Sequence, residues 1–200
     1  MGISERKQRE KEIVREKILE AAWRIVQEKG WVSLSLRNIA EAIEYSTPVI
    51  YNHFESKEAL IRVFYRKGFQ LLYNRLLEVA NGKLDPDNKI YQVAMSYWNF
   101  AFENKHYYQV MFGVDVPCCV NEEILEEKKQ MILLFQHIVE EALLINKNTV
   151  PDPALKRSTF WSILHGLVSI NFTSRILKEE GKTEKVLDDA VLAFIKSLKV

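Results

Sequence analysis

The sequence predicts an all-α protein with a three-helix headpiece followed by a larger helical bundle. Apolar residues recur at three- and four-residue spacing along most of the 200 residues, and only seven glycines and five prolines accompany these long patterns. A pattern of two short helices joined by a tight turn lies between Leu34 and Leu60. We therefore expect the headpiece over residues 1–56 and the bundle over residues 57–200.

The composition is that of an ordinary globular protein. Hydrophobic residues make up 48% of the chain and charged residues 28%, and no apolar run reaches the roughly 20 residues that a membrane span needs. Residues 1–11 are charged, which predicts a frayed, solvated arm and no signal peptide. We expect no membrane partner and a cytoplasmic location.

The charge balance does not indicate a nucleic-acid partner by itself. The net charge is +1, and residues 1–60 contain ten Lys and Arg against ten Asp and Glu. A basic surface would have to come from the arrangement of these residues rather than from their number.

The first helix of the headpiece is expected over residues 12–29. Gly30 follows it, at the place where a helix C-terminus favours a left-handed residue. The apolar stripe of this helix has a period near 3.6 residues and consists of Ile13, Ile18, Ala21, Ala22, Ile25 and Val26.

Two short helices follow. Ser35 is expected to cap the first by accepting a hydrogen bond from the amide of Asn38. The second is expected from Thr47, as its cap, to Phe54, with Pro48 in its first turn. Helices of about two turns are unstable alone in water, so the preceding helix must cover their apolar sides. Such a trio, with its last helix exposed, is the helix-turn-helix unit that places a recognition helix in the DNA major groove.

Residues 21–60 resemble the DNA-binding domain of TetR-type transcriptional regulators. One departure is Glu44, which stands in the turn where that family usually has glycine. A left-handed backbone there costs about 1 kcal/mol, so we expect this turn to be differently shaped. Pro48 replaces another common glycine, at a position where proline is acceptable. The matching features are Ala21–Ala22, Gly30, Ser33-x-Ser35, Ile39–Ala40, Ser46, Tyr51-x-His53-Phe54 and Lys57–Glu58.

The resemblance and the helix-turn-helix geometry together assign the DNA contacts. The first turns of the recognition helix are expected to face base edges, while flanking donors bind phosphates. The alternatives are that Tyr51 and His53 are a packed ring and a hydrogen-bonded imidazole, and that Asn52 is simply solvated. The base-facing set is Thr47, Pro48, Val49 and Asn52, and the phosphate-binding set is Ser35, Arg37, Tyr51, His53 and Lys57.

Six helices are expected after the headpiece. The first, with Leu71 and Leu72 on its buried side, begins beside the headpiece and ends inside the bundle, so we expect it to transmit motion between them. The expected spans are residues 56–79, 87–103, 105–112, 121–145, 153–177 and 184–198, with Ser56, Asp87 or Asn88, Asn121 and Thr183 as caps.

Trp161, His165 and Gly166 form a pattern that resembles the C-terminal domain of a TetR subgroup named for its Trp-His-Gly residues, and residues 106–112 resemble it too. This resemblance implies a domain that binds a small-molecule effector and forms a homodimer. The alternative for any single aromatic residue is plain core. The expected pocket set is Tyr97, Trp98, Phe102, Tyr107, Tyr108, Phe112, Phe135, Trp161 and His165. The last two helices are expected to bury one face in their own subunit and another against a second copy, and the expected dimer set is Phe160, Leu164, Leu167, Val168, Leu192, Phe194 and Ile195.

Other chemistry has little support in the sequence. Cys118 and Cys119 are adjacent, and they are interpreted either as buried thiols in a reducing cytosol or as a vicinal dithiol that senses oxidants or a soft metal. His106, His137 and His165 are too dispersed for metal ligation or acid–base catalysis. We expect no metal, no cofactor and no enzymatic activity.

We therefore expect a homodimeric repressor that binds a palindromic double-stranded DNA operator and is released by a small apolar or aromatic effector. The alternative is a helical ligand-binding or protein-interaction module without sequence-specific DNA binding. Glu44 and the neutral headpiece favour that alternative.

Overall fold

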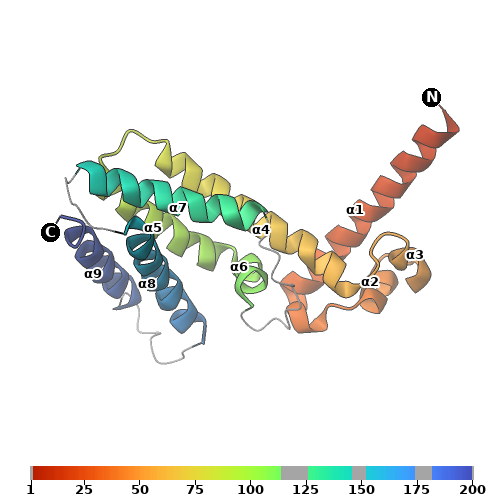
Figure 1. The fold of residues 1–200 in the computed structure, drawn as a ribbon. Coiled ribbons are helices and arrows are strands. Elements are labelled where there is room, and N and C mark those ends of the chain that lie inside the picture. Colours follow the sequence, from red (N-terminus) through yellow and green to blue (C-terminus); the bar gives the residue numbers. More distant parts are fainter. Residues whose placement is uncertain (1, 114–125, 146–151, 174–181, 200) are drawn as a thin grey trace. The chain divides into compact units, whose positions relative to one another are not determined.

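The computed structural model describes residues 2–113, 126–145, 152–173 and 182–199, and within these ranges the regular structure is helical throughout (Figure 1). The all-α prediction is confirmed. None of the described helices is long and apolar enough to cross a membrane. The elements are α1 (Ile3–Lys29), the 3-10 helix η1 (Trp31–Ser33), α2 (Leu36–Ala42), α3 (Thr47–Tyr51), α4 (Lys57–Ala80), α5 (Pro86–Glu103), α6 (Lys105–Phe112), α7 (Glu126–Ile145), α8 (Pro153–Thr173) and α9 (Lys182–Lys196).

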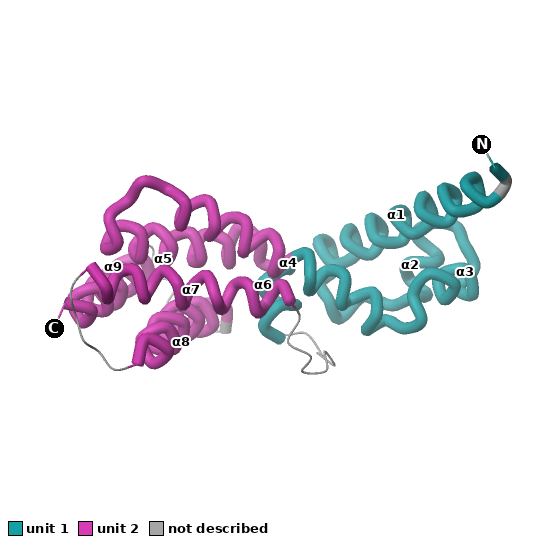
Figure 2. The backbone as a smooth tube through the Cα atoms, turned by 45° about the horizontal axis from the view of Figure 1, so that its top comes forward, with its two compact units in different colours: residues 1–67, 106–123 teal, residues 68–105, 124–200 magenta. Residues whose placement is uncertain are grey.

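The chain divides into two compact units (Figure 2). The first unit consists of Met1–Lys67 and His106–Glu123, and the second of Gly68–Lys105 and Ile124–Val200. Nearly all of α6 therefore belongs to the unit that contains α1 to α3. The division into domains at residue 56 stays a prediction.

Helix α1 begins nine residues before the predicted start at residue 12, so the expectation of a frayed arm is wrong. The amide of Gly2 donates to the Glu5 carboxylate at 3.0 Å, and Arg6 pairs with Glu10 one turn on at 2.9 Å. These local contacts satisfy a free amide and stabilise the first turns of the helix. Ile13 is 47% exposed rather than buried, because the buried stripe of α1 begins only at Ile18.

An aromatic cluster holds α6 in the first unit. The Trp23 ring stacks on the Tyr107 ring with 4.2 Å between centroids, and on the Phe64 ring with 5.4 Å. The indole Nε1–H of buried Trp31 donates to the carbonyl oxygen of His106 at 2.9 Å. A buried indole needs such an acceptor, so α6 completes the core of this unit.

Helix α5 is the centre of the second unit and packs against α7, α8 and α9. Its buried face includes Tyr97 and Phe100, and Lys89 near its start is the one charged side chain that is buried among the described residues. The Lys89 ammonium donates to both oxygens of the Glu141 carboxylate on α7, at 2.9 and 2.7 Å. This paired charge fixes α5 against α7, because a buried cation without its partner is strongly unfavourable.

Several predicted boundaries and faces of the second unit are wrong. The cap of α5 is Asp85, whose carboxylate accepts the amide of Asn88 at 3.0 Å, and that hydrogen bond lowers the pKa of Asp85. Leu71 is 39% exposed, because it faces away from the buried Leu72 side of α4. Thr183 cannot cap α9, since that helix already includes Lys182. Asn121, Cys118 and Cys119 lie outside the described residues.

Candidate nucleic-acid interface

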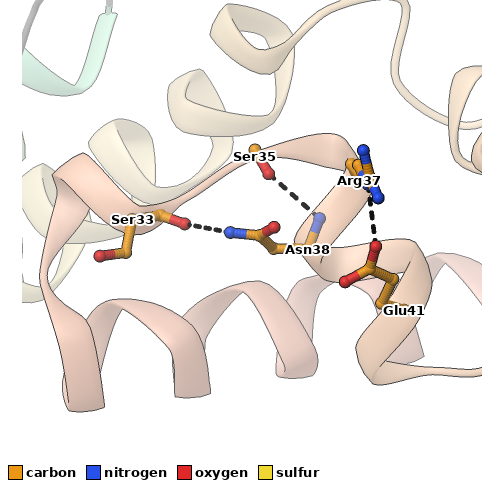
Figure 3. A network of polar contacts seen from close by, with 5 residues as sticks. All are labelled: Ser33, Ser35, Arg37, Asn38 and Glu41. Carbon is orange, nitrogen blue, oxygen red and sulfur yellow. Dashed lines mark hydrogen bonds and ion pairs between the residues drawn. The ribbon is translucent and has the colours of Figure 1, made fainter.

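The start of α2 is held by the side chains of Ser35 and Asn38 (Figure 3). The Ser35 hydroxyl accepts the amide of Asn38 at 3.0 Å, as predicted, and the Asn38 side chain donates to the carbonyl oxygen of Ser33 at 2.8 Å. Ser35 has the extended backbone of a helix cap. These bonds tie α2 to the end of η1 and leave the side chain of Arg37 exposed in the first turn of α2.

Arg37 is already engaged within its own helix. Its Nε donates to the Glu41 carboxylate at 2.9 Å, and the two side chains are 82% and 63% exposed (Figure 3). The hydrogen bond and the charge of Glu41 raise the pKa of Arg37. The guanidinium can bind a phosphate fully only by turning away from this carboxylate.

The turn between α2 and α3 contains a residue with a left-handed backbone, although that residue is not glycine. Glu44 has φ of 60°, the only positive φ at a non-glycine residue in the described chain. The amide of Tyr45 donates to the carbonyl oxygen of Ala40 at 3.0 Å, which closes the end of α2. Glu44 therefore adopts the left-handed conformation that glycine would adopt more easily, and the expected change in the shape of this turn is not observed.

The recognition helix α3 is shorter than predicted. It ends at Tyr51 rather than Phe54, because the amides of His53 and Phe54 both donate to the carbonyl oxygen of Ile50 and wind the chain into a turn. Its N-cap is Ser46, not Thr47, which is already helical. Ile50 and Phe54 are buried at 0% and 3% exposure, as predicted.

The nine predicted DNA contacts all lie in the first unit, but their exposure differs. Pro48, Tyr51 and Asn52 are exposed, and Tyr51 at 55% is not the packed aromatic ring of the alternative reading. The half-buried members are Ser35, Thr47, Val49, His53 and Lys57, and Arg37 is exposed.

His53 occupies an unusual position in the turn after α3. Its side chain is half-buried, and its Nδ1 atom is buried without a hydrogen-bond partner. Burial lowers the pKa of His53, and the positive charges of Lys11 and Arg15 lower it further. The alternative of a hydrogen-bonded imidazole therefore does not describe Nδ1.

Two residues near the interface were missed by sequence reasoning. Tyr45, in the turn before α3, is 37% exposed. Arg15 of α1 donates from Nη1 to the carbonyl oxygen of His53 at 3.2 Å. No local pattern indicates Arg15, because its partner lies 38 residues later in the chain.

Comparison with known proteins gives this geometry a family. Residues 18–64 match the model of the bacterial regulatory proteins of the tetR family, and residues 90–194, more than half of the chain, match that of a tetracyclin repressor-like C-terminal domain. The chain belongs to the TetR family. It therefore has the DNA-binding helix-turn-helix and the ligand-binding domain of TetR-type transcriptional regulators. Membership of the Trp-His-Gly subgroup stays a prediction.

Individual relatives agree with this family. The HTH-type transcriptional regulator PksA of Bacillus subtilis (strain 168) is 28% identical over 89 residues, which are 44% of this chain and 43% of PksA. The match thus spans less than half of that relative. A protein of unknown function from Rhodococcus sp. RHA1 has the same fold with a TM-score of 0.78 at 20% identity, over 93% of this chain and 95% of its own. The fatty acid degradation regulator FadR from Bacillus halodurans has a TM-score of 0.71 at 16% identity, over 92% and 96%.

The predicted effector-pocket residues of this TetR-family protein fall in both units. In the second unit the Tyr97 hydroxyl lies 3.2 Å from His165 Nδ1, and the Trp161 ring stacks on the His165 ring with 5.4 Å between centroids. Phe102 is 43% exposed and stacks on Phe172. The second unit holds Tyr97, Trp98, Phe102, Phe135, Trp161 and His165, whereas the first holds Tyr107, Tyr108 and Phe112.

Most of the predicted dimer residues are covered inside the second unit. Phe160 of α8 stacks on Phe194 of α9 with 4.8 Å between centroids, and both are core residues. Their apolar periodicity reflects α8–α9 packing within one chain, and the contact of this set with a second subunit stays a prediction. Phe160, Leu164, Val168, Phe194 and Ile195 are all buried, while Leu167 is half-buried and Leu192 is 49% exposed.

The described part of the chain contains no group of three or more His, Cys, Asp or Glu side chains that could hold a metal ion. Of the three dispersed histidines, His106 lies with Nδ1 3.2 Å from the Gln109 side-chain oxygen, and His137 is exposed. Only His165 joins the aromatic cluster of the second unit.

Proposed function

We propose that this TetR-family protein is a dimeric repressor that binds a palindromic operator through α3 and leaves it when a small apolar or aromatic effector binds. The observation that carries the proposal is the two-sided character of α3. Ile50 and, just beyond the helix, Phe54 anchor it in the core, while Pro48, Tyr51 and Asn52 remain exposed. A helix held in this way presents its first turns to base edges in a major groove.

The surroundings of α3 supply phosphate donors on both sides. Arg37 precedes it on α2, and Lys57 follows it in the first turn of α4. Tyr51 adds an exposed hydroxyl, and such groups fix the register of a helix on DNA without reading its sequence. Thr47 and Val49 offer methyl groups suited to thymine.

A second copy is proposed to pack on the outer face of α8 and α9. From Ser158 to Thr173, α8 contains no Asp, Glu, Lys or Arg. Gly166 has open space where a side chain would stand, and Ile170 and Leu192 are 48% and 49% exposed. This uncharged stretch of α8, with its close-approach glycine, suits an isologous contact between two copies. Two-fold symmetry would place the recognition helices roughly 34–36 Å apart, or somewhat more, on successive major-groove faces.

The effector is proposed to bind near the Tyr97–His165 pair. This pair places two polar atoms among aromatic rings. The Trp161 ring stacks on the His165 ring, and the centroids of the Phe135 and Trp161 rings lie 5.6 Å apart. Such a lining suits an apolar or aromatic molecule with one polar group. The structural likeness to FadR of Bacillus halodurans, described as a fatty acid degradation regulator, supports an apolar effector. By linkage, the effector must bind the DNA-free state more tightly.

Fluorescence anisotropy with DNA from upstream of the protein's own gene tests the proposal. We expect tight binding that survives an excess of random competitor DNA at moderate salt. Tyr51→Ala combined with Lys57→Ala should weaken binding and make its salt dependence shallower, because fewer counterions are released. Binding that ignores sequence would contradict the proposal and favour a helical module without specific DNA recognition.

A further inference from the structure

Helix α3 has five residues and cannot hold its orientation by itself. Its buried residue Ile50 and, just beyond the helix, Phe54 attach one side of it to the core, but they do not fix its C-terminal end against rotation. The carbonyl groups at a helix C-terminus also need donors from outside the helix. A side chain from another helix is therefore needed to hold the Asn52–Phe54 turn.

Arg15 of α1 makes two different contacts with this turn. Its Nη1 donates to the carbonyl oxygen of His53 at 3.2 Å, and its guanidinium carbon lies 4.3 Å from the centroid of the Phe54 ring. The first contact is directional and the second depends on a planar cation over an aromatic face. Both contacts come from one half-buried side chain on a 27-residue helix.

We propose that Arg15 is a positioning residue for the recognition helix, which it holds at the angle that operator recognition requires. This inference rests on the proposed function. It assigns Arg15 to the inside of the DNA-binding unit and not to the DNA, so Arg15 acts through the His53–Phe54 turn. Lysine cannot replace it, because an ammonium group lacks the planar fork that donates and stacks at the same time.

The charges around the turn provide a readout that is independent of DNA. His53 is surrounded by Lys11, Glu12 and Arg15 of α1, and both Lys11 and Arg15 lower its pKa while Glu12 raises it. Removing the Arg15 charge should raise the pKa of His53, whereas a lysine at this position should keep much of the effect. Comparing these two replacements therefore separates the effect of Arg15 on the position of the turn from the effect of its charge on the pKa of His53.

The experiment compares Arg15→Lys and Arg15→Met in the full-length protein with Arg24→Lys and Arg24→Met, which change an exposed arginine of the same helix. Affinity for operator and for random DNA is measured against salt concentration, and NMR follows the His53 titration and the exchange of the Phe54 amide. We expect about tenfold weaker operator binding in both Arg15 variants, random-DNA binding within twofold, and an unchanged salt slope. The Phe54 amide should exchange faster in both, and the pKa of His53 should rise mainly in Arg15→Met.

Two outcomes overturn the inference. Equal losses on operator and random DNA, with a salt slope lower by about 0.9, would make Arg15 a phosphate contact. Unchanged operator binding and Phe54 exchange would make it a surface residue. If Arg15→Met does not fold, Arg15→Lys decides by the same criteria. If the unmodified protein shows no operator preference, the proposed function fails, and faster Phe54 exchange alone then decides whether Arg15 holds the turn.

Discussion

The guanidinium of Arg37 donates its Nε–H to Glu41, so a DNA phosphate competes with this carboxylate for that donor, while the Nη groups can still reach the DNA backbone. Exposed ion pairs one helical turn apart are weak in water, so a phosphate can displace the carboxylate. The displaced carboxylate nevertheless remains near the DNA and repels it. At the scale of single residues, the repulsion between the Glu41 carboxylate and the DNA therefore weakens DNA binding more than the loss of the Arg37–Glu41 ion pair does.

Replacing Glu41 should strengthen operator binding. We expect Glu41→Gln to lower the dissociation constant about threefold and to steepen the salt slope, because Arg37 then binds phosphate without competition. Anisotropy titrations between low and moderate salt measure both quantities. Glu78→Gln, which removes one exposed negative charge in the second unit, should leave them unchanged. Equal effects of the two variants would show that only net charge matters.

The lowered pKa of His165 predicts that the free energy of unfolding falls on mild acidification. Burial lowers its pKa in the folded protein, and the charge of Lys128 lowers it further. As the pH falls below 6.5, the unfolded chain binds a proton that the folded chain does not yet accept, so the free energy of unfolding decreases until the pH reaches the folded pKa.

Urea unfolding at pH 7.5 and pH 5.5, followed by circular dichroism, measures this decrease. We expect a smaller decrease for His165→Gln, in which an uncharged amide can still bond the Tyr97 hydroxyl. His137→Gln, at an exposed histidine of α7, is the matched control and should behave like the unmodified protein. If His165→Gln also matches the unmodified protein, His165 does not carry the effect.

At the scale of elements, the α2–α3 turn stores strain at Glu44. We expect Glu44→Gly to raise the free energy of unfolding by up to about 1 kcal/mol, since glycine adopts positive φ without a Cβ clash. Glu44→Ala keeps the Cβ atom and should give no such gain. Thermal unfolding of the three proteins separates relief of strain from removal of charge, and a gain in the alanine variant would point to charge.

Local chemistry predicted some elements well and others poorly. Ser35 was identified as a cap because its position before Asn38 is sufficient to make that bond. The caps Ser46 and Asp85 were missed by one and by two or three residues, because several adjacent residues could serve and only the tertiary fold selects one. The start of α1 was missed because polar contacts, not an apolar stripe, form its first turns.

At the scale of the whole molecule, sequence periodicity cannot distinguish an intramolecular interface from an intermolecular one. Phe160 and Phe194 have the spacing expected of a dimer seam, yet they stack on each other within one chain. The same limit applies to the aromatic residues proposed for the pocket, which fall in two units. Arg15 could not be found at all, because its role exists only when α1 and the turn after α3 are together.

The proposed dimer face gives a prediction for the assembled protein. Leu192→Asp should convert the dimer to a monomer, because the charge would be buried between two copies without a partner. Analytical ultracentrifugation should show half the mass, and operator affinity should fall about 100-fold as the second recognition helix is lost. Leu144→Asp on α7, where Leu144 is 77% exposed, should remain dimeric. A dimeric Leu192→Asp protein would exclude this face.

The place of α6 has a practical consequence for engineering. A fragment ending at residue 67 would contain every predicted DNA contact, but it would lack the carbonyl group to which Trp31 donates and one of the two rings on which Trp23 stacks. Its bare indoles would favour misfolding or aggregation. A chimera that joins this DNA-binding unit to another ligand-binding domain must therefore also include residues 106–112, although some forty residues of the second unit separate them from residue 67.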